Sequence, residues 1–207
     1  MAEFAPGHAR KDDQGLAPQH SCKPMEPSEY EVPETLRDGT KIIIRAIRPS
    51  DGGPIREQFA NLSAESVRFR FHGMRRAPGE NETQLLTNLD FENQVALVAT
   101  LSDQPDQPVG GARYVRSGEG SDRHRRPEVA FLVLDKYQGK GVGSLLLRHL
   151  AIIARAQGVN EFEAYVLADN QRMLRVFERG GFPTTARSSS SGVLRLTLSI
   201  AAEPKEN

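Results

Sequence analysis

The sequence EVAFLVLDKYQGKGVGSLLLR, at residues 128–148, contains three structural signals in succession. An unbroken apolar run at residues 129–134 is typical of a strand that is buried on both faces. A polar turn at residues 135–138 and three alternate glycines follow it, and the spacing of the apolar residues after them indicates a packed helix. The stretch therefore predicts a strand, a glycine-rich turn and a helix.

The glycine-rich turn has the properties of a phosphate-binding site. Gly139, Gly141 and Gly143 lack a Cβ atom, so the backbone can turn sharply there and approach a ligand closely. Unpaired N–H groups in the first turn of the helix can then bind phosphate oxygens, and Lys140 would add a formal charge. The turn is neither a P-loop nor a dinucleotide-binding fingerprint, since Gly141 follows Lys140 where a P-loop has Ser or Thr, and Ser144 replaces the fingerprint's third glycine.

Glu128 opens the buried strand and is a candidate general base. An acid beside a ligand-binding turn can remove a proton from a reacting group. The residues alone leave two interpretations of Glu128 open, a catalytic base and a surface glutamate at a strand end.

The composition excludes several classes of protein. The 207 residues include 27 acidic and 27 basic side chains, and a net charge of zero gives no electrostatic basis for nucleic-acid binding. Cys22 is the single cysteine, which excludes a disulfide framework within the chain. With His8 and His20 it matches no zinc pattern, so we expect no metal. No apolar run approaches the ~20 residues that span a bilayer, and we expect a cytoplasmic enzyme without a membrane or nucleic-acid partner.

The chain is predicted to consist of one domain and two terminal segments. Residues 1–33 are rich in Pro, Gly, Gln and charged side chains, and are predicted to form a disordered tail. Residues 34–200 contain the apolar periodicity of a folded domain, and residues 201–207 are expected to form a disordered end.

Within the domain, the hydrophobic pattern and the turn residues predict an α+β fold. Strands are expected over residues 41–47, 95–101, 109–116, 129–134, 162–167 and 193–200, with another opened by Phe182. Helices are expected over residues 54–62, 63–71 and 170–179, besides the helix after the glycine-rich turn, with one or two helical turns at residues 83–89. The short links indicate a mostly antiparallel sheet of about seven strands, flanked by about four helices.

Two motifs resemble those of the GCN5-related N-acetyltransferases (GNAT), which hold acetyl-CoA. Gln138-x-x-Gly141-x-Gly143, placed between a strand and a long helix, resembles the family's pyrophosphate-binding signature. Asn170, followed by a helix and then by Gly181-Phe182, is similar to the second motif, whose Asn contacts the pantetheine arm. The resemblance covers about residues 34–200 and implies the GNAT acyl-CoA N-acyltransferase fold, with acetyl-CoA as co-substrate and no metal.

Further motifs resemble the catalytic domain of bacterial Pat-type protein lysine acetyltransferases. They are LRDGT at residues 36–40, IR at 44–45 with RPxD at 48–51, LSxxS at 62–66, RF at 70–71 and EVAF at 128–131. This resemblance implies that Glu128 is the general base and that the acceptor is a lysine of a protein, such as an acyl-CoA synthetase. Cys22 lies in the tail without a paired His, so we expect direct transfer from acetyl-CoA in a ternary complex, without an acylated enzyme.

The family resemblance implies a set of cofactor-binding residues around the glycine-rich turn. The backbone at residues 132–134 would pair with the pantetheine amides like an added strand. The implied set is Leu132, Val133, Leu134, Gln138, Gly139, Lys140, Gly141, Val142, Gly143, Ser144, Asn170 and Phe177. Phe177 departs from the family, because many members carry there a Tyr that protonates the leaving thiolate, and we expect water to do so here.

Two alternatives to a protein lysine acetyltransferase remain open on the sequence. The fold alone allows a small-molecule amine as acceptor, and Phe177 mildly favours a non-catalytic module that senses acyl-CoA. Against a polyamine acceptor, the loops near Glu128 carry Arg70, Arg75, Arg76 and residues 123–126, which would repel a cation and could bind acidic groups around a target lysine. We expect a protein partner and a monomer or weak homodimer.

Overall fold

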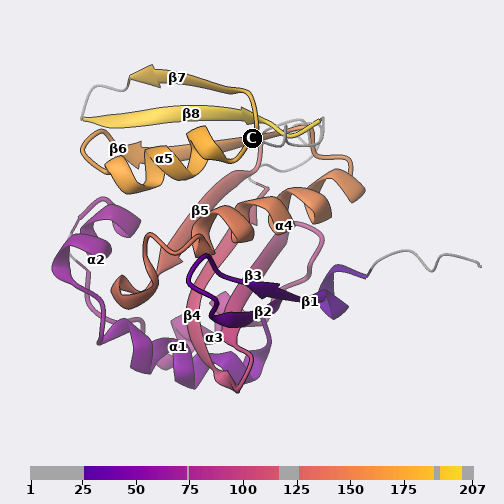
Figure 1. The fold of residues 1–207 in the computed structure, drawn as a ribbon, viewed down its shortest axis with the longest axis vertical. Helices are drawn as coiled ribbons and strands as arrows, with labels where there is room; N and C mark the ends of the chain where they lie inside the picture. The colour runs from indigo at the N-terminus through magenta and orange to yellow at the C-terminus, as the bar shows by residue number, and fades with distance from the viewer. Residues whose placement is uncertain (1–25, 74, 117–125, 189–191, 202–207) are drawn as a thin grey trace, which may run out of the picture.

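The computed structural model describes residues 26–73, 75–116, 126–188 and 192–201, which form one sheet with helices on both faces (Figure 1). The strands are β1 (Glu31–Thr35), β2 (Lys41–Ala46), β3 (Gln94–Leu101), β4 (Gln104–Val115), β5 (Glu128–Val133), β6 (Glu161–Leu167), β7 (Thr184–Ser188) and β8 (Val193–Ser199). The α-helices are α1 (Gly52–Phe59), α2 (Ala64–Phe71), α3 (Glu80–Thr87), α4 (Val142–Ala156) and α5 (Gln171–Arg179). Short 3-10 helices are η1 (Pro27–Glu29), η2 (Pro49–Asp51) and η4 (Asp135–Tyr137).

The sheet order is β1-β2-β3-β4-β5-β6-β8-β7, and every neighbouring pair except one is antiparallel. The exception is the parallel pair β5–β6, which α4 connects and which has a single register pair, Glu128 with Glu163. The two strands therefore pair only where β5 begins and diverge after it. The predicted α+β class and the mostly antiparallel sheet are confirmed.

The described part of the chain holds eight strands and five α-helices, one of each more than the sequence predicted. The additional strand is β1, a charged edge strand that contains Pro33 and has no apolar alternation to reveal it. It forms because it pairs with β2 along its whole length, beside the buried Tyr30. The domain thus begins before residue 34, and the predicted boundary at residue 33 is too late. Residues 1–25 and 202–207, and with them Cys22, lie outside the described ranges.

The core lies mainly between the sheet and α4, which packs across β3, β4 and β5 (Figure 1). Its centre consists of fully buried apolar side chains, among them Leu97, Tyr114, Leu146, Leu150, Ile153 and Phe162. A smaller cluster on the other face joins Ala96 and Val98 of β3 to Ile55 of α1. The central strand β3 is therefore buried on both faces, as its continuous apolar sequence requires. None of the helices in the described ranges is both long enough and apolar enough to cross a membrane.

A buried ion pair fixes the start of α1 against β2. Arg45 donates two hydrogen bonds to the Asp51 carboxylate, at 2.7 and 2.9 Å, and both side chains are less than a tenth exposed. Asp51 also accepts from the backbone N–H of Arg48 at 2.7 Å. The hydrogen bonds that Arg45 donates to Asp51 raise the pKa of Arg45, against the effect of burial.

Removal of the Asp51 carboxylate would leave the Arg45 guanidinium buried without its carboxylate. We expect Asp51→Ala to lower the free energy of unfolding by about 3 to 5 kcal/mol in urea denaturation. Glu31→Ala is the matched control, because it breaks the exposed ion pair with Arg48, for which we expect a loss below about 1 kcal/mol. Equal losses in the two variants would mean that the buried pair stabilises no more than a surface pair.

A second buried network connects α4 to the N-terminal segment. The Tyr30 hydroxyl donates to Nδ1 of His149 at 2.5 Å, and Nε2 of His149 donates to Glu34 at 2.9 Å. These bonds suit a neutral imidazole with its proton on Nε2. Burial, opposed by the hydrogen bond to Glu34, lowers the pKa of His149 below 6.5.

The lowered pKa of His149 makes the stability of the fold depend on pH. The unfolded chain takes up a proton at this residue before the folded chain does, so this contribution is complete above about pH 6.5 and is lost as the pH falls toward the folded pKa. We expect His149→Gln to reduce the loss of unfolding free energy between about pH 8 and about pH 5.5. A loss equal to that of the wild type would contradict this role.

Candidate functional site

A cavity of about 510 Å³ opens where β5 and β6 diverge. Its walls come from β5, the glycine-rich turn, α2, β6 and α5. Most of the predicted site residues line it, namely Glu128, Leu132, Val133, Gln138, Gly139, Gly141, Val142, Gly143, Ser144, Asn170 and Phe177. Leu134 and Lys140 are not among the lining residues. Lys140 instead forms an ion pair with Asp38 at 2.9 Å, which lowers the pKa of Asp38 to about 2.

The backbone of the turn requires glycine at two positions. Gly139 and Gly141 have φ angles of +75° and +105°, in the left-handed region that side chains with a Cβ rarely adopt. Gly141 is the N-cap of α4, and no side chain caps the helix there. The first N–H groups of α4 are therefore left for a ligand, at the positive end of the helix dipole.

The glycine at position 143 serves helix packing. A Cβ atom at Gly143 would lie 3.3 Å from a methyl group of Val176, so glycine lets α4 approach α5 closely at the floor of the cavity. The glycine pattern thus combines two requirements, the left-handed turn before α4 and the contact between α4 and α5.

The edge of β5 that faces β6 is open along most of its length. The N–H of Leu134 donates to Val109 of β4, and the alternation of an antiparallel pair directs Leu132 toward β4 as well. Phe131 and Val133 consequently direct their N–H groups toward β6, which has already diverged. The structure thus favours Phe131 and Val133, rather than Leu132 and Leu134, as the residues whose backbone can pair with an extended ligand.

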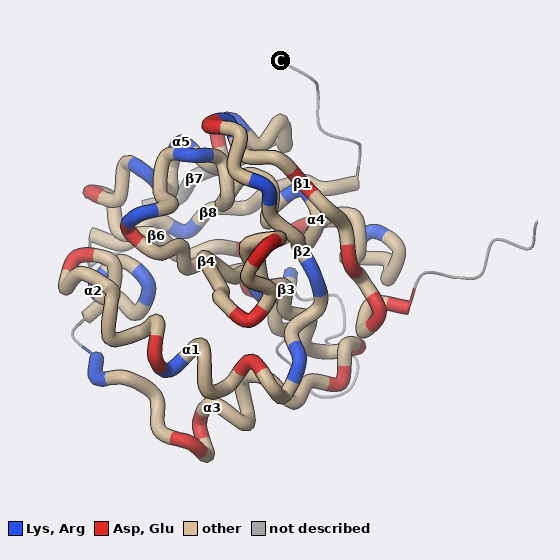
Figure 2. The backbone as a smooth tube through the Cα atoms, turned by 60° about the horizontal axis from the view of Figure 1, so that its bottom comes forward, with Lys and Arg blue, Asp and Glu red and all other residues tan. Residues whose placement is uncertain are grey.

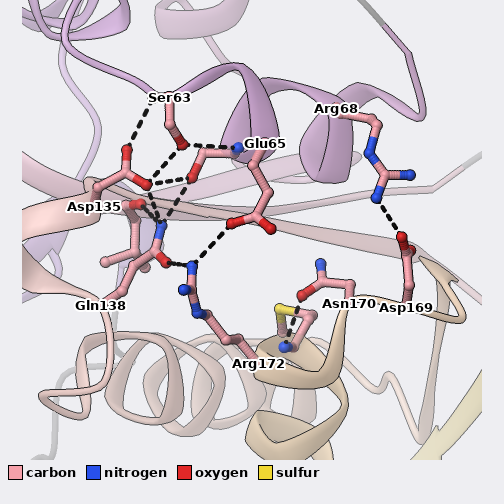
Figure 3. Close-up of polar contacts among 11 residues, drawn as sticks. Ser63, Glu65, Arg68, Asp135, Gln138, Asp169, Asn170 and Arg172 are labelled. Carbon is pink, nitrogen blue, oxygen red and sulfur yellow. Dashed lines mark hydrogen bonds and ion pairs between the residues drawn. The ribbon is translucent and has the colours of Figure 1, made fainter.

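Asp135 anchors α2 to the turn (Figure 3). Its carboxylate accepts from the backbone N–H of Ser63 at 3.0 Å and from the hydroxyls of Ser63 and Ser66, each at 2.9 Å. Burial raises the pKa of Asp135, but these hydrogen bonds outweigh burial and leave the pKa below its ordinary value. No local pattern predicted this role of Asp135, because Ser63 lies 72 residues away in the chain.

Gln138 joins the same network through its side chain (Figure 3). Its amide nitrogen donates to Ser66 at 2.9 Å and to the carbonyl of Val133 at 3.0 Å, and its amide oxygen accepts from Arg172 at 2.9 Å. The conspicuous Gln of the motif therefore connects β5, α2 and α5. Its backbone N–H also donates to the carbonyl of Asp135 at 3.2 Å, so Gln138 holds the turn in place and leaves the ligand to the glycines and the start of α4.

Asn170 and Phe177 form the wall that α5 contributes. The side-chain oxygen of Asn170 caps α5 by accepting from the N–H of Met173 at 3.1 Å, while its NH₂ group has no partner among the described residues. That group can donate to a ligand carbonyl (Figure 3). Phe177 is 2% exposed and packs edge-on against Phe131 at 5.8 Å, so it supplies an apolar surface and no proton.

The cavity also has cationic lining residues that the sequence analysis missed. Arg37 lies against Gly141, and Arg172, Arg175 and Arg179 recur at helical spacing along α5. Figure 2 shows basic positions, in blue, along this helix. This spacing of three and four residues is a signal that could have identified the arginines of α5. Such side chains suit a ligand with several phosphates.

Glu128 lies at the end of the cavity where β5 begins. Glu128 and Asp135 are the acids among the described lining residues, and Asp135 is engaged by Ser63 and Ser66. Glu128 is exposed and forms no hydrogen bond or ion pair within the described ranges. It is therefore the acid that is free to exchange a proton with a ligand. No group of three or more metal-ligating side chains occurs in the part of the chain that the structure describes.

The family model for the acetyltransferase (GNAT) family matches residues 64–182, which include α2, the glycine-rich turn and α5. The chain belongs to this family. Acetyltransferase Pat of Mycolicibacterium smegmatis is 32% identical over 155 residues, covering 72% of this GNAT chain and 44% of that protein. Acetyltransferase PA5475 of Pseudomonas aeruginosa is 30% identical over 141 residues, covering 68% of this chain and 74% of that protein. The chain thus spans less than half of the first relative.

Solved structures agree with this assignment. The GNAT domain of S. lividans PAT superposes with a TM-score of 0.74 at 34% identity, covering 82% of this chain and 96% of that chain. The structure of yncA from Salmonella typhimurium with its cofactor acetyl-CoA has a TM-score of 0.61 at 21% identity, covering 79% and 98% of the two chains, and supports the fold alone. The predicted GNAT fold and the resemblance to Pat enzymes are confirmed, whereas the roles of the individual site residues stay predictions.

The glycine-rich turn generates a direct test of the cofactor site. We expect Gly141→Asp to weaken acetyl-CoA binding at least about tenfold in isothermal titration, because it strains the left-handed backbone and places a carboxylate beside the phosphate position. Gly158→Asp is the matched control, since Gly158 also has a positive φ, +76°, but follows the other end of α4. Unchanged affinity in Gly141→Asp, or an equal loss in Gly158→Asp, would contradict a phosphate site at this turn.

Proposed function

We propose that this chain transfers an acetyl group from acetyl-CoA to the side-chain amine of a lysine in a protein. Membership of the acetyltransferase family and the names of the Pat relatives support the reaction class. The single observation that carries the proposal is the position of Glu128, an acid without a protein partner in the described ranges, at one end of a cavity whose other end is built for phosphate.

The residues around the cavity fit acetyl-CoA. The N–H groups at the start of α4 and the guanidinium groups of Arg37 and Arg175 would bind its phosphates. The open edge of β5 at Phe131 and Val133 would pair with its amide groups, with a further hydrogen bond from the NH₂ group of Asn170. When bound, acetyl-CoA supplies an acetyl group activated as a thioester.

Glu128 would act on the acceptor amine. Its carboxylate takes a proton from the lysine ammonium, directly or through a water molecule, and the freed lone pair of the amine attacks the thioester carbonyl carbon. A C–N bond forms, the C–S bond breaks, the electron pair leaves with sulfur, and the nitrogen releases its second proton to water. Phe177 cannot protonate this sulfur, and the Tyr165 hydroxyl already donates to Glu163 at 2.7 Å, so water supplies the proton. The acetyl group passes directly from acetyl-CoA to the amine. A protein lysine as acceptor and a cytoplasmic location are parts of the same proposal.

Glu128 can be tested separately from cofactor binding. We expect Glu128→Gln to reduce the turnover rate at neutral pH by roughly a hundredfold or more, while the Kd of acetyl-CoA stays unchanged. The control is Glu161→Gln, because Arg126 already holds that carboxylate at 2.5 Å and it does not line the cavity. Normal turnover of Glu128→Gln across the pH range would remove Glu128 from the mechanism.

The acceptor is best identified with labelled acetyl-CoA in a cell lysate. We expect the label on lysine side chains of proteins, and mapping of the modified lysines would identify them. Label in small amines only would restrict the function to a small-molecule N-acetyltransferase. Tight binding of acetyl-CoA without transfer to any amine would instead favour an acyl-CoA-sensing module.

A further inference from the structure

Two arginines, Arg70 and Arg113, lie near Glu128, at the end of the cavity where β5 begins. Arg70 lies in the last turn of α2 and lines the cavity. Arg113 of β4 pairs in register with Ala130, two residues from Glu128 on β5, so both side chains point to the same face of the sheet. Each of the two guanidinium groups interacts electrostatically with the Glu128 carboxylate.

Neither arginine has a hydrogen bond or an ion pair within the described ranges, although both are partly buried. Several nearby arginines do have such partners, with Arg68 bound to Asp169, Arg75 to Glu82, Arg126 to Glu161 and Arg172 to Glu65. The lining arginines Arg37, Arg175 and Arg179 resemble Arg70 in having no ion pair within the described ranges, but they lie toward the glycine-rich turn and α5. The Arg70 guanidinium lies over the face of Phe71, 4.9 Å from the ring centre. Arg70 and Arg113 are thus two cations that the fold leaves without a bound carboxylate.

The electrostatics of this pair are unfavourable in the protein alone. Burial, reinforced by repulsion from Arg113, lowers the pKa of Arg70 to about 10. Burial also lowers the pKa of Arg113. Glu128 is the nearby acid that opposes both effects, so one carboxylate faces two guanidinium groups. An anion placed between them would recover the free energy that their partial desolvation costs.

This anion does not come from the phosphates of acetyl-CoA. Glu128 and the glycine-rich turn lie at opposite ends of β5, and the strand from Glu128 to Val133 spans roughly 17 Å. The glycine-rich turn and the arginines of α5 can bind the phosphates. Arg70 and Arg113 instead lie near Glu128, which the acceptor must approach. A planar guanidinium favours a carboxylate, which it binds through two parallel hydrogen bonds.

We propose that Arg70 and Arg113 bind a carboxylate of the acceptor, so that the enzyme selects a lysine with Asp or Glu beside it. This inference rests on the proposed function of the same site. Of the basic residues that the sequence suggested for binding acidic groups around a target lysine, this inference retains Arg70. Arg75 and Arg126 are already ion-paired, Arg76 is exposed and does not line the cavity, and residues 123–125 lie outside the described ranges. Arg113 was not among the candidates.

The test compares two peptides that are identical except for Glu or Gln next to the acceptor lysine, with a free amino acid as a third acceptor. We expect the wild type to favour the Glu peptide in kcat/KM by at least about tenfold, the size expected for a charge-assisted hydrogen bond. Arg70→Gln and Arg113→Gln should each reduce this preference through a higher KM for the Glu peptide. Arg70→Lys should keep part of this preference, because lysine retains the positive charge but cannot form two parallel hydrogen bonds to a carboxylate.

Arg75→Gln is the matched control, since it removes a nearby charge that is bound to Glu82, and it should keep the full preference. An equal rate with both peptides in the wild type, or a preference that survives in Arg70→Gln and Arg113→Gln, would overturn the inference and leave the proposed function intact. Preference for the free amino acid over both peptides would overturn the assignment to a protein carboxylate. Transfer to none of the acceptors, with acetyl-CoA bound, would remove the proposed function and this inference together.

Discussion

The divergence of β5 from β6 is the constraint on which the rest of the molecule depends. A parallel pair that continued beyond Glu128 and Glu163 would close the sheet and occupy the backbone groups of Phe131 and Val133. Because α4 starts directly after the turn that follows β5, its free N–H groups face the same opening. A single separation of two strands therefore provides the pairing edge, the phosphate site and the approach to Glu128. The apolar packing of α4 over β3 and β4 holds these parts in place.

Polar side chains after β5 hold the helices on both sides of the cavity in position. Asp135 and Gln138 follow β5, and their hydrogen bonds hold α2 and α5 on opposite sides of the cavity (Figure 3). The ion pairs Glu65–Arg172 and Arg68–Asp169 join the same two helices at the surface, where solvent weakens them. The half-buried hydrogen bonds of Gln138 and Asp135 consequently contribute more to the position of α2 than the exposed charges do.

Local sequence signals predicted the parts of the site that are local in the chain. The strand, the turn and α4 follow one another within residues 128–156, and Asn170 caps α5 as its position before an apolar-periodic segment indicated. Contacts between distant segments could not be predicted in this way. The strand β1 exists through its pairing with β2, Lys140 is drawn to Asp38 of another turn, and Arg113 reaches Glu128 only because β4 and β5 are neighbours. Family resemblance identified Glu128, whereas its freedom from protein partners became visible only in three dimensions.

The two ends of the short helix α2 make different contacts. Its start, at the N-cap Ser63 and at Ser66, is hydrogen-bonded to Asp135 and Gln138, and its last turn carries Arg70, which lines the cavity. Under the proposed function, substitutions in the last turn would alter the choice of acceptor while the attachment at the start of the helix stays intact. In evolutionary terms, such a helix lets related enzymes diverge in their targets without rebuilding the catalytic framework, and it offers protein engineers a small segment in which to redirect specificity.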